Sequence, residues 1–255
     1  MTVAKVVEAL SIPSNARVDK RVPKKKLMEQ SIPTAGDKKQ IQDGVDETTW
    51  IATLKPNNIG VPIFRDNVRE YLEIIILTTK LRGTAKAARL IELIHRAIPY
   101  PVVLITEQSD TVSLSLSHKR WSLGESGKVV IEDLRITAPF ETEPLTAEQS
   151  AFLSSLALSG LPRRDLFSLY QGWLDRMAAL EASEITGVFK LPVSTDRSSA
   201  LREKLDNHSK LKHEIVILRS SAEKETQINR RVELNLEIKN REDEISSLLE
   251  TIKLE

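Results

Sequence analysis

Acidic residues near the first apolar run of the chain are the first candidates for catalysis. A restriction-type nuclease holds a divalent cation between carboxylates and a lysine at neighbouring strand ends, and the cation activates the attacking water. Glu73 and Lys80 are seven positions apart, which departs from the usual Glu-x-Lys spacing, and a surface position at a strand end is the favoured interpretation of Glu73. A metal-dependent nuclease with a degenerate site is therefore only an alternative function, and its candidate residues are Asp66, Glu70, Glu73 and Lys80.

Histidine, glycine and cysteine offer little further chemistry. The four histidines, at positions 95, 118, 208 and 213, include no pair with the i, i+4 spacing of a helical zinc site. No glycine-rich phosphate loop and no Gly-x-Ser-x-Gly elbow occurs. The chain has 0 cysteines, so it has no disulfide, thiolate zinc site or cysteine nucleophile. We expect no catalytic residues, no metal and no other cofactor, and a role other than enzyme is favoured.

Clustered basic residues suggest contact with nucleic acid. A basic segment runs from Arg17 to Lys26, and lysines and arginines release counterions when they meet phosphates. A solvated loop that packs through its valines is the favoured interpretation of this segment, because a short charge run is weak evidence of binding. The net charge of +1 is too small for the chain as a whole to bind polyelectrolytes such as nucleic acids through its overall charge. The candidate contacts are Lys24, Lys25, Lys26, Lys86, Arg89, Lys119, Arg120 and Trp121. The indole of Trp121 could stack on a base.

A strand, a helix and a second strand organise the segment that carries these residues. The almost continuous apolar run at 72–78 suits a strand buried on both faces. Apolar residues then recur at helical spacing until Pro99, and a second apolar run follows at 102–105. Such a unit can be a right-handed crossover between parallel strands. We therefore predict an α+β fold, in which residues 1–140 form a globular domain with a mixed β-sheet of about five strands and a crossover helix.

The remainder of the chain is helical. Residues 145–190 carry a strong apolar stripe and are expected to pack on the globular domain. Residues 197–255 contain neither glycine nor proline, and two apolar series change phase near Glu225. This pattern indicates an imperfect coiled-coil tail, either one interrupted long helix or a helical hairpin. The tail lacks the apolar surface to be stable alone, so we expect partner contacts through Leu211, Ile215, Leu218, Ile238, Ile245, Leu249 and Ile252.

Composition agrees with a globule that carries a solvated segment. Of the 255 residues 40% are hydrophobic and 29% are charged, a low and a high value respectively for a compact domain. The N-terminus has no apolar signal core, and no run approaches about 18 apolar residues. We expect no contact with a membrane and a cytoplasmic location.

Several short segments within residues 1–180 resemble a prokaryotic domain family of unknown function. Its members are small proteins, often encoded beside SNF2-type or DEAD/DEAH helicases and DNA methyltransferases in anti-phage defence and restriction islands. The resemblance carries over no catalytic residue. It implies a non-catalytic accessory subunit that docks on a helicase, translocase or other defence protein through its helical tail. Contact of this subunit with DNA is a further option. A nucleic-acid-binding homo-oligomeric scaffold is an alternative function. The resemblance rests on Ile12-Pro13, Val22-Pro23-Lys24, Leu54-Lys55-Pro56-Asn57-Asn58-Ile59, His95-Arg96-Ala97-Ile98-Pro99-Tyr100-Pro101 and Leu116-Ser117-His118-Lys119-Arg120-Trp121.

Overall fold

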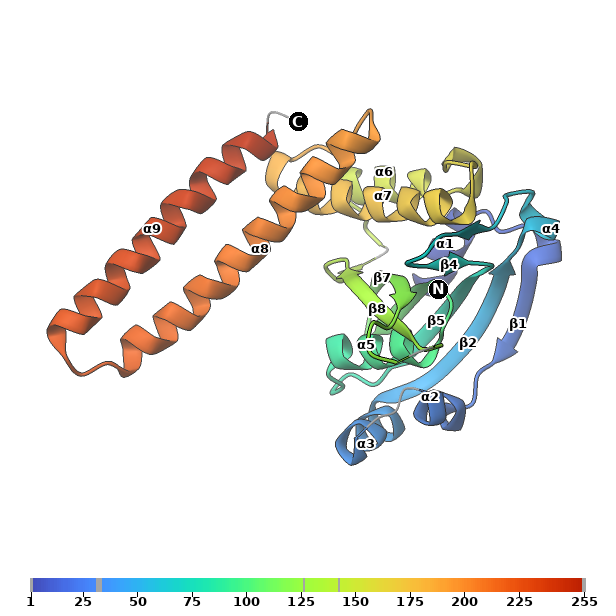
Figure 1. The fold of residues 1–255 in the computed structure, drawn as a ribbon, viewed down its shortest axis with the longest axis horizontal. Coiled ribbons are helices and arrows are strands. Elements are labelled where there is room, and N and C mark those ends of the chain that lie inside the picture. Colours follow the sequence, from blue (N-terminus) through green and yellow to red (C-terminus); the bar gives the residue numbers. More distant parts are fainter. Residues whose placement is uncertain (1, 31–33, 126, 142, 254–255) are drawn as a thin grey trace. The chain divides into compact units, whose positions relative to one another are not determined.

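Two compact units make up the chain, which divides after Met177 in the middle of a long helix. The first unit spans residues 1–177 and the second spans residues 178–255. The predicted α+β fold, with a mixed sheet followed by helices through the C-terminus, is confirmed (Figure 1). The computed structural model describes residues 2–30, 34–125, 127–141 and 143–253.

A mixed sheet forms the centre of the first unit. Within the described residues it has seven strands in the order β1-β2-β5-β6-β7-β8, with β9 paired to β7. Among these described strands, β5 and β6 pair in parallel and the other pairs are antiparallel. A separate hairpin joins β3 to β4. The strands are β1 (Arg17–Arg21), β2 (Val45–Leu54), β3 (Phe64–Arg65), β4 (Glu70–Tyr71), β5 (Ile74–Leu81), β6 (Val102–Gln108), β7 (Thr111–Trp121), β8 (Val129–Ile136) and β9 (Phe140–Glu141).

The predicted crossover is the unit β5–α5–β6, in which α5 spans Ala87–Ala97. The sheet is larger than the expected five strands, because short segments with little apolar pattern also join it. One of them lies in the basic segment, which forms the edge strand β1 and then the helix α2 (Lys24–Gln30). Pro23 separates the two elements, as expected of a residue that cannot donate a backbone hydrogen bond.

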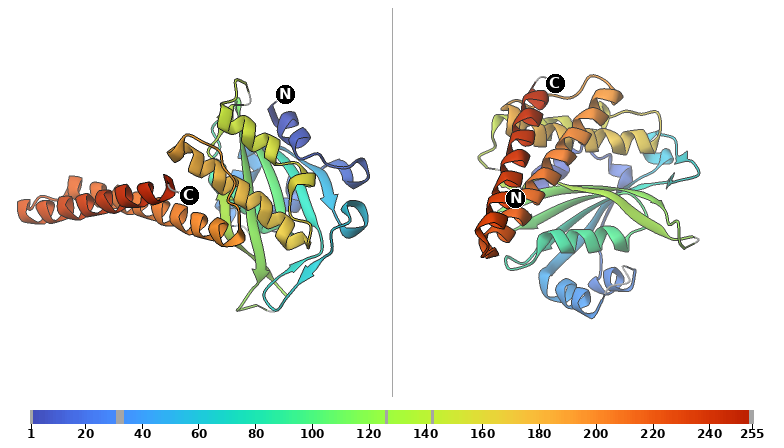
Figure 2. Two further views of the ribbon diagram at one scale, coloured as in Figure 1. Left: turned by 90° about the horizontal axis from the view of Figure 1, so that it is seen from above. Right: turned by 60° about the vertical axis from the view of Figure 1, so that its left-hand side comes forward.

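Helices cover both faces of this sheet. On one face α5 and α2 enclose a core with Ile75, Leu77 and Leu104. The other face carries α6, and α7 is attached to it through Tyr170 (Figure 2). Buried residues of α7 include Trp173, whose indole N–H donates to Leu156 O at 3.0 Å. The remaining helices and turns of this unit are α1 (Thr2–Ala9), η1 (Ser14–Ala16), α3 (Ala35–Gly44), α4 (Pro56–Ile59), α6 (Ala147–Ser155), η2 (Leu158–Gly160) and α7 (Leu166–Thr186), whose last turns belong to the second unit.

The second unit contains two helices that pack against each other, α8 (Thr195–Lys224) and α9 (Ile228–Lys253). Of the two arrangements left open, one long helix or a hairpin, the structure forms the hairpin, and the chain turns near Glu225, where the apolar phase changes. Ion pairs between the helices join Arg219 to Glu242 at 2.7 Å and Arg241 to Glu214 at 3.0 Å. Coiled-coil geometry stays a prediction. Among the described residues, no helix combines the length and the apolarity needed to cross a bilayer.

Candidate functional site

Strand β7 directs two adjacent titratable residues to opposite faces of the sheet. Side chains alternate along a strand, and the pairing of β7 with β8 shifts register between Ser117 and His118. On β8 the shift falls at Asp133, which has a φ of 51°. His118 contacts Gln171 on α7, whereas Lys119 donates to the carbonyl oxygen of His95 on α5.

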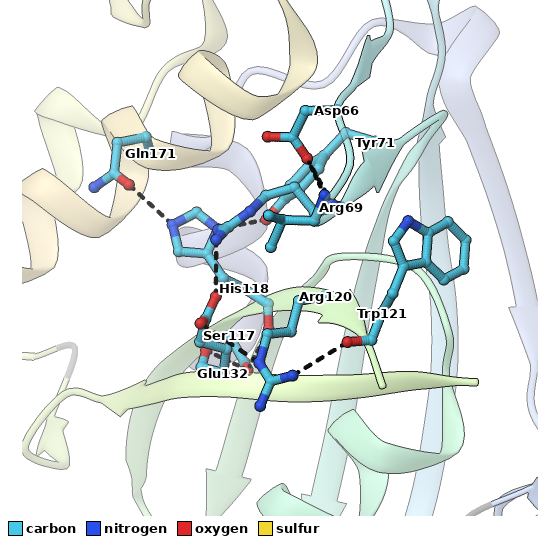
Figure 3. A network of polar contacts seen from close by, with 10 residues as sticks. Asp66, Arg69, Tyr71, Ser117, His118, Arg120, Trp121, Glu132 and Gln171 are labelled. Atoms are coloured by element: carbon cyan, nitrogen blue, oxygen red, sulfur yellow. Dashed lines mark hydrogen bonds and ion pairs between the residues drawn. The ribbon is translucent and has the colours of Figure 1, made fainter. Parts of the chain in front are cut away.

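Both ring nitrogens of His118 are engaged (Figure 3). Nε2 lies 2.9 Å from Oε1 of Gln171, an oxygen that only accepts, so Nε2 carries the proton. Nδ1 then accepts from the hydroxyl of Tyr71. Burial lowers the pKa of His118 and raises the pKa of Tyr71, and the cation of Arg69 acts against a charged imidazole. The pair is therefore a neutral imidazole and a protonated phenol.

Aromatic and charged side chains close this network. Phe167 stacks on His118 with 5.0 Å between the ring centroids. The guanidinium of Arg69 lies 5.3 Å from the centroid of Phe167 and 3.1 Å from a carboxylate oxygen of Glu132. Arg120 approaches the other oxygen of Glu132 at 3.6 Å (Figure 3). The network joins β4, β7, β8 and α7. Because His118 has an exposed fraction of 7%, little of its imidazole is in contact with solvent.

The predicted nucleic-acid contacts lie on three elements. On α2, Lys25 and Lys26 are exposed, while Lys24 donates to Gln42 O at 3.0 Å. Lys86 is exposed at the start of α5. Arg89 is held by Asp37 through two hydrogen bonds of 2.9 Å and by Glu92, and this guanidinium lowers the pKa of Asp37 to about 2. Its charge is thus already compensated.

The third group, on β7, is the least accessible to a phosphate. Lys119 has an exposed fraction of only 2%, so its ammonium lies inside the protein and away from the surface that a nucleic-acid backbone would touch. Arg120 and Trp121 are half-buried. The sequence treats these three residues as one basic stretch, whereas strand alternation and burial separate them.

The acidic residues considered for a nuclease serve other contacts. Glu73 pairs with Lys55 at 2.7 Å, and Lys80 pairs with Glu107 at 3.6 Å. The carboxylate of Asp66 accepts from the backbone N–H groups of Val68 and Arg69, and Glu70 pairs with Arg65. In the part of the chain that the structure describes, no three histidine, aspartate or glutamate side chains gather in a group that could hold a metal ion.

The predicted partner-binding residues of the tail mostly face the inside of the hairpin. Leu211, Ile215, Ile238 and Ile252 are buried, and Leu218 and Ile245 pack beside them. Leu249 is half-buried. These side chains therefore hold α8 and α9 together.

A second apolar stripe lies on the outer side of α9. Ile228, Val232 and Leu236 follow one another at intervals of four residues and have exposed fractions of 69%, 52% and 58%. This spacing places the three side chains on one helix face. The buried residue in this part of α9 is Leu234, which packs with Ile215 and Ile238. Val232 and Leu236 were missed, although their spacing from Ile228 is visible in the sequence.

Comparison with known proteins identifies a family. A protein-family model described as "Domain of unknown function (DUF4391)" matches residues 10–245, which is most of both units. No curated protein and no solved structure matches the chain significantly.

Proposed function

We propose that this chain, which belongs to the DUF4391 family of domains of unknown function, is a non-catalytic adaptor that docks on another protein through its α8–α9 hairpin. The partner we propose is a helicase or translocase of an anti-phage, restriction-like defence complex, in line with the resemblance noted from the sequence. The observation that carries the proposal is the exposed apolar stripe of Ile228, Val232 and Leu236.

The stripe has the composition of a protein-binding helix face. Full burial of one large aliphatic side chain contributes roughly 1.5–3 kcal/mol, so three half-exposed side chains offer several kcal/mol to a partner. Charged residues border the stripe, among them Arg230 and Glu233, which pair at 2.7 Å. An apolar centre with a polar rim is the usual anatomy of an interface, and a helix with one apolar stripe fits a groove of its partner.

Replacement of the stripe should weaken association and leave the hairpin folded. In the triple variant Ile228→Ser, Val232→Ser, Leu236→Ser we expect the Kd for the proposed helicase partner to rise at least tenfold, because about 1.4 kcal/mol of lost contact already gives that factor. Co-purification and calorimetric titration of the two full-length proteins measure it. Helicity by circular dichroism should not change, since the inner seam is intact.

The matched control changes the same helix without touching the stripe. Glu237→Gln, Glu250→Gln removes two exposed charges of α9 and should keep wild-type association. Wild-type affinity of the triple variant for the helicase would contradict the proposal. Light scattering separates the homo-oligomeric scaffold from the adaptor, because a wild-type dimer that becomes monomeric in the triple variant would assign the stripe to self-association.

We also propose that the adaptor contacts DNA through its basic edge. The exposed side chains of Lys25 and Lys26 follow the edge strand β1, which exposes Lys20 and Arg21. Each phosphate contact contributes about 0.9 to the slope of log K against log salt on duplex DNA. The variant Lys25→Glu, Lys26→Glu should therefore lower that slope by about 2 in gel-shift titrations. An unchanged slope, or no shift of wild-type protein at low salt, would contradict DNA contact.

A further inference from the structure

A groove of about 610 Å³ lies over β1 and β2 where α4 adjoins their ends (Figure 1). Its volume falls within the range of about 300–1,000 Å³ that is typical of sites for drug-sized molecules, so a ligand of the size of one nucleotide fits it. The lining residues that matter for its chemistry are Lys20, Trp50, Thr53, Lys55 and Asn57.

Trp50 forms an aromatic wall of this groove. Lys20 and Trp50 are opposite each other in the ladder between β1 and β2, and opposite residues of an antiparallel pair extend to the same face of the sheet. The indole N–H of Trp50 donates to Ala52 O and to Thr53 Oγ1, both at 3.0 Å, and these bonds hold the ring along β2. Trp50 is half-buried, and no aromatic ring of the described residues stacks on it. The part of the ring that lines the groove is therefore available to a flat group.

The charge of the groove favours an anion. Among the described residues, the charged side chains that line it are Arg17, Lys20 and Lys55, all of them cationic. Asp19 holds Arg17 through two hydrogen bonds of 2.9 Å, and Glu73 pairs with Lys55 at 2.7 Å. Lys20 is exposed, and no carboxylate of the described residues lies within ion-pair distance of its ammonium. The groove therefore combines an uncompensated cation with an aromatic ring on the same face of the sheet.

We propose that this groove binds single-stranded nucleic acid, with one base stacked on Trp50 and an adjoining phosphate at Lys20. Aromatic rings that stack on bases, together with cations that follow the backbone, are the usual parts of a single-strand site. In a duplex the neighbouring base pairs cover the faces of each base, so Trp50 has no face to stack on. The exposed amides of Asn15 and Asn57 line the groove and can donate to base carbonyl oxygens. The inference rests on the proposed contact of the basic edge with DNA, because Lys20 lies on that edge, and it specifies the form of the nucleic acid.

Fluorescence titration of the full-length protein tests the proposal. The probes are an oligothymidylate of about ten nucleotides, an abasic strand of the same length, the duplex of the oligothymidylate with oligoadenylate, an oligouridylate and a polyglutamate peptide. We expect the oligothymidylate to quench tryptophan fluorescence. We also expect it to bind at least tenfold more tightly than the abasic strand, the duplex or polyglutamate, because only a single strand with bases can stack on the ring. Tighter binding of the oligothymidylate than of the oligouridylate identifies DNA as the source of the strand, and the reverse identifies RNA.

Two pairs of variants test the ring and the cation separately. Trp50→Leu should lose about tenfold in affinity for the oligothymidylate and keep its affinity for the duplex. Tyr100→Leu removes a partly exposed aromatic side chain outside the groove and should match wild type. Lys20→Gln should lower the slope of log K against log salt by about 0.7, the value for one phosphate contact on a single strand. Lys39→Gln, at an exposed position of α3, should leave that slope unchanged.

Several results would overturn the inference. One is wild-type affinity of Trp50→Leu, folded by circular dichroism, for the oligothymidylate, and another is a wild-type salt slope in Lys20→Gln, whose exposed side chain can be replaced without loss of the fold. Binding of the abasic strand or of polyglutamate as tight as that of the oligothymidylate is a third. Duplex binding that depends on Lys25 and Lys26 without preference for the single strand overturns this inference alone, whereas absence of binding to any nucleic acid also contradicts the DNA contact of the adaptor.

Discussion

Tyr170→Phe should lower the free energy of unfolding by about 2–4 kcal/mol, because two buried backbone groups would each lose a partner at roughly 1–3 kcal/mol. The hydroxyl of Tyr170 donates to Val102 O at 2.7 Å and accepts from Ser117 N at 2.8 Å. Val102 and Ser117 are opposite each other in the ladder between β6 and β7. One hydroxyl from α7 therefore completes the hydrogen bonding at this end of the ladder.

Two measurements check this result. Urea denaturation gives the loss of stability, and amide hydrogen exchange should report faster exchange at Ser117, whose N–H would have lost its acceptor. Tyr100→Phe is the matched control, because Tyr100 is partly exposed and makes no side-chain hydrogen bond in the described structure. If both variants lost the same stability, the contact of Tyr170 with the sheet would not be the reason.

Acid should destabilise the protein steeply between pH 6.5 and 5. Burial lowers the pKa of His95 and of His118 below the value of about 6.5 that they have in the unfolded chain. Above pH 6.5 both histidines are neutral in the folded and in the unfolded protein, and the stability is fully present. Below pH 6.5 the two histidines bind protons in the unfolded chain but not in the folded protein. The free energy of unfolding therefore falls as pH falls, by up to about 2.7 kcal/mol per pH unit for two histidines.

The groups around each histidine support this direction. His95 has an exposed fraction of 0%, its Nε2 lies 3.0 Å from Ser115 Oγ, and the cation of Lys119 lies beside it. His118 is buried against α7, with Gln171 and the carboxylates of β8 only partly offsetting burial. Lys119 itself titrates in a different window, because its folded pKa of about 7 lies below the unfolded value. It therefore adds stability as pH rises above 7.

Substitutions separate the contributions. His118→Gln should remove up to about 1.4 kcal/mol per pH unit from the slope of stability against pH, which is the largest contribution that one proton can make. His213→Gln, at an exposed position of α8, should leave the slope unchanged. Urea titrations at intervals of half a pH unit between pH 5 and 7 measure it, and a slope that is the same in His118→Gln and wild type would refute the assignment. Asp37, with a pKa of about 2, acts only at lower pH.

Local patterns in the sequence determined the elements of this protein. The apolar run at 72–78 and the helical spacing before Pro99 predicted the β5–α5–β6 crossover, because a strand buried on both faces and an amphipathic helix leave distinct periods. The change of apolar phase near Glu225 located the break between α8 and α9, although it left open whether the second helix turns back.

The tertiary structure decided which side chains are available for function. His118 and Lys119 are neighbours in the sequence, yet their partners are Tyr71, Gln171 and His95, which are 47, 53 and 24 positions away. A residue's burial depends on such distant elements, so sequence reasoning placed Lys119 on a basic surface when it is buried inside the protein. In the hairpin, the direction of the turn likewise determined which apolar residues face inward and left Val232 and Leu236 exposed.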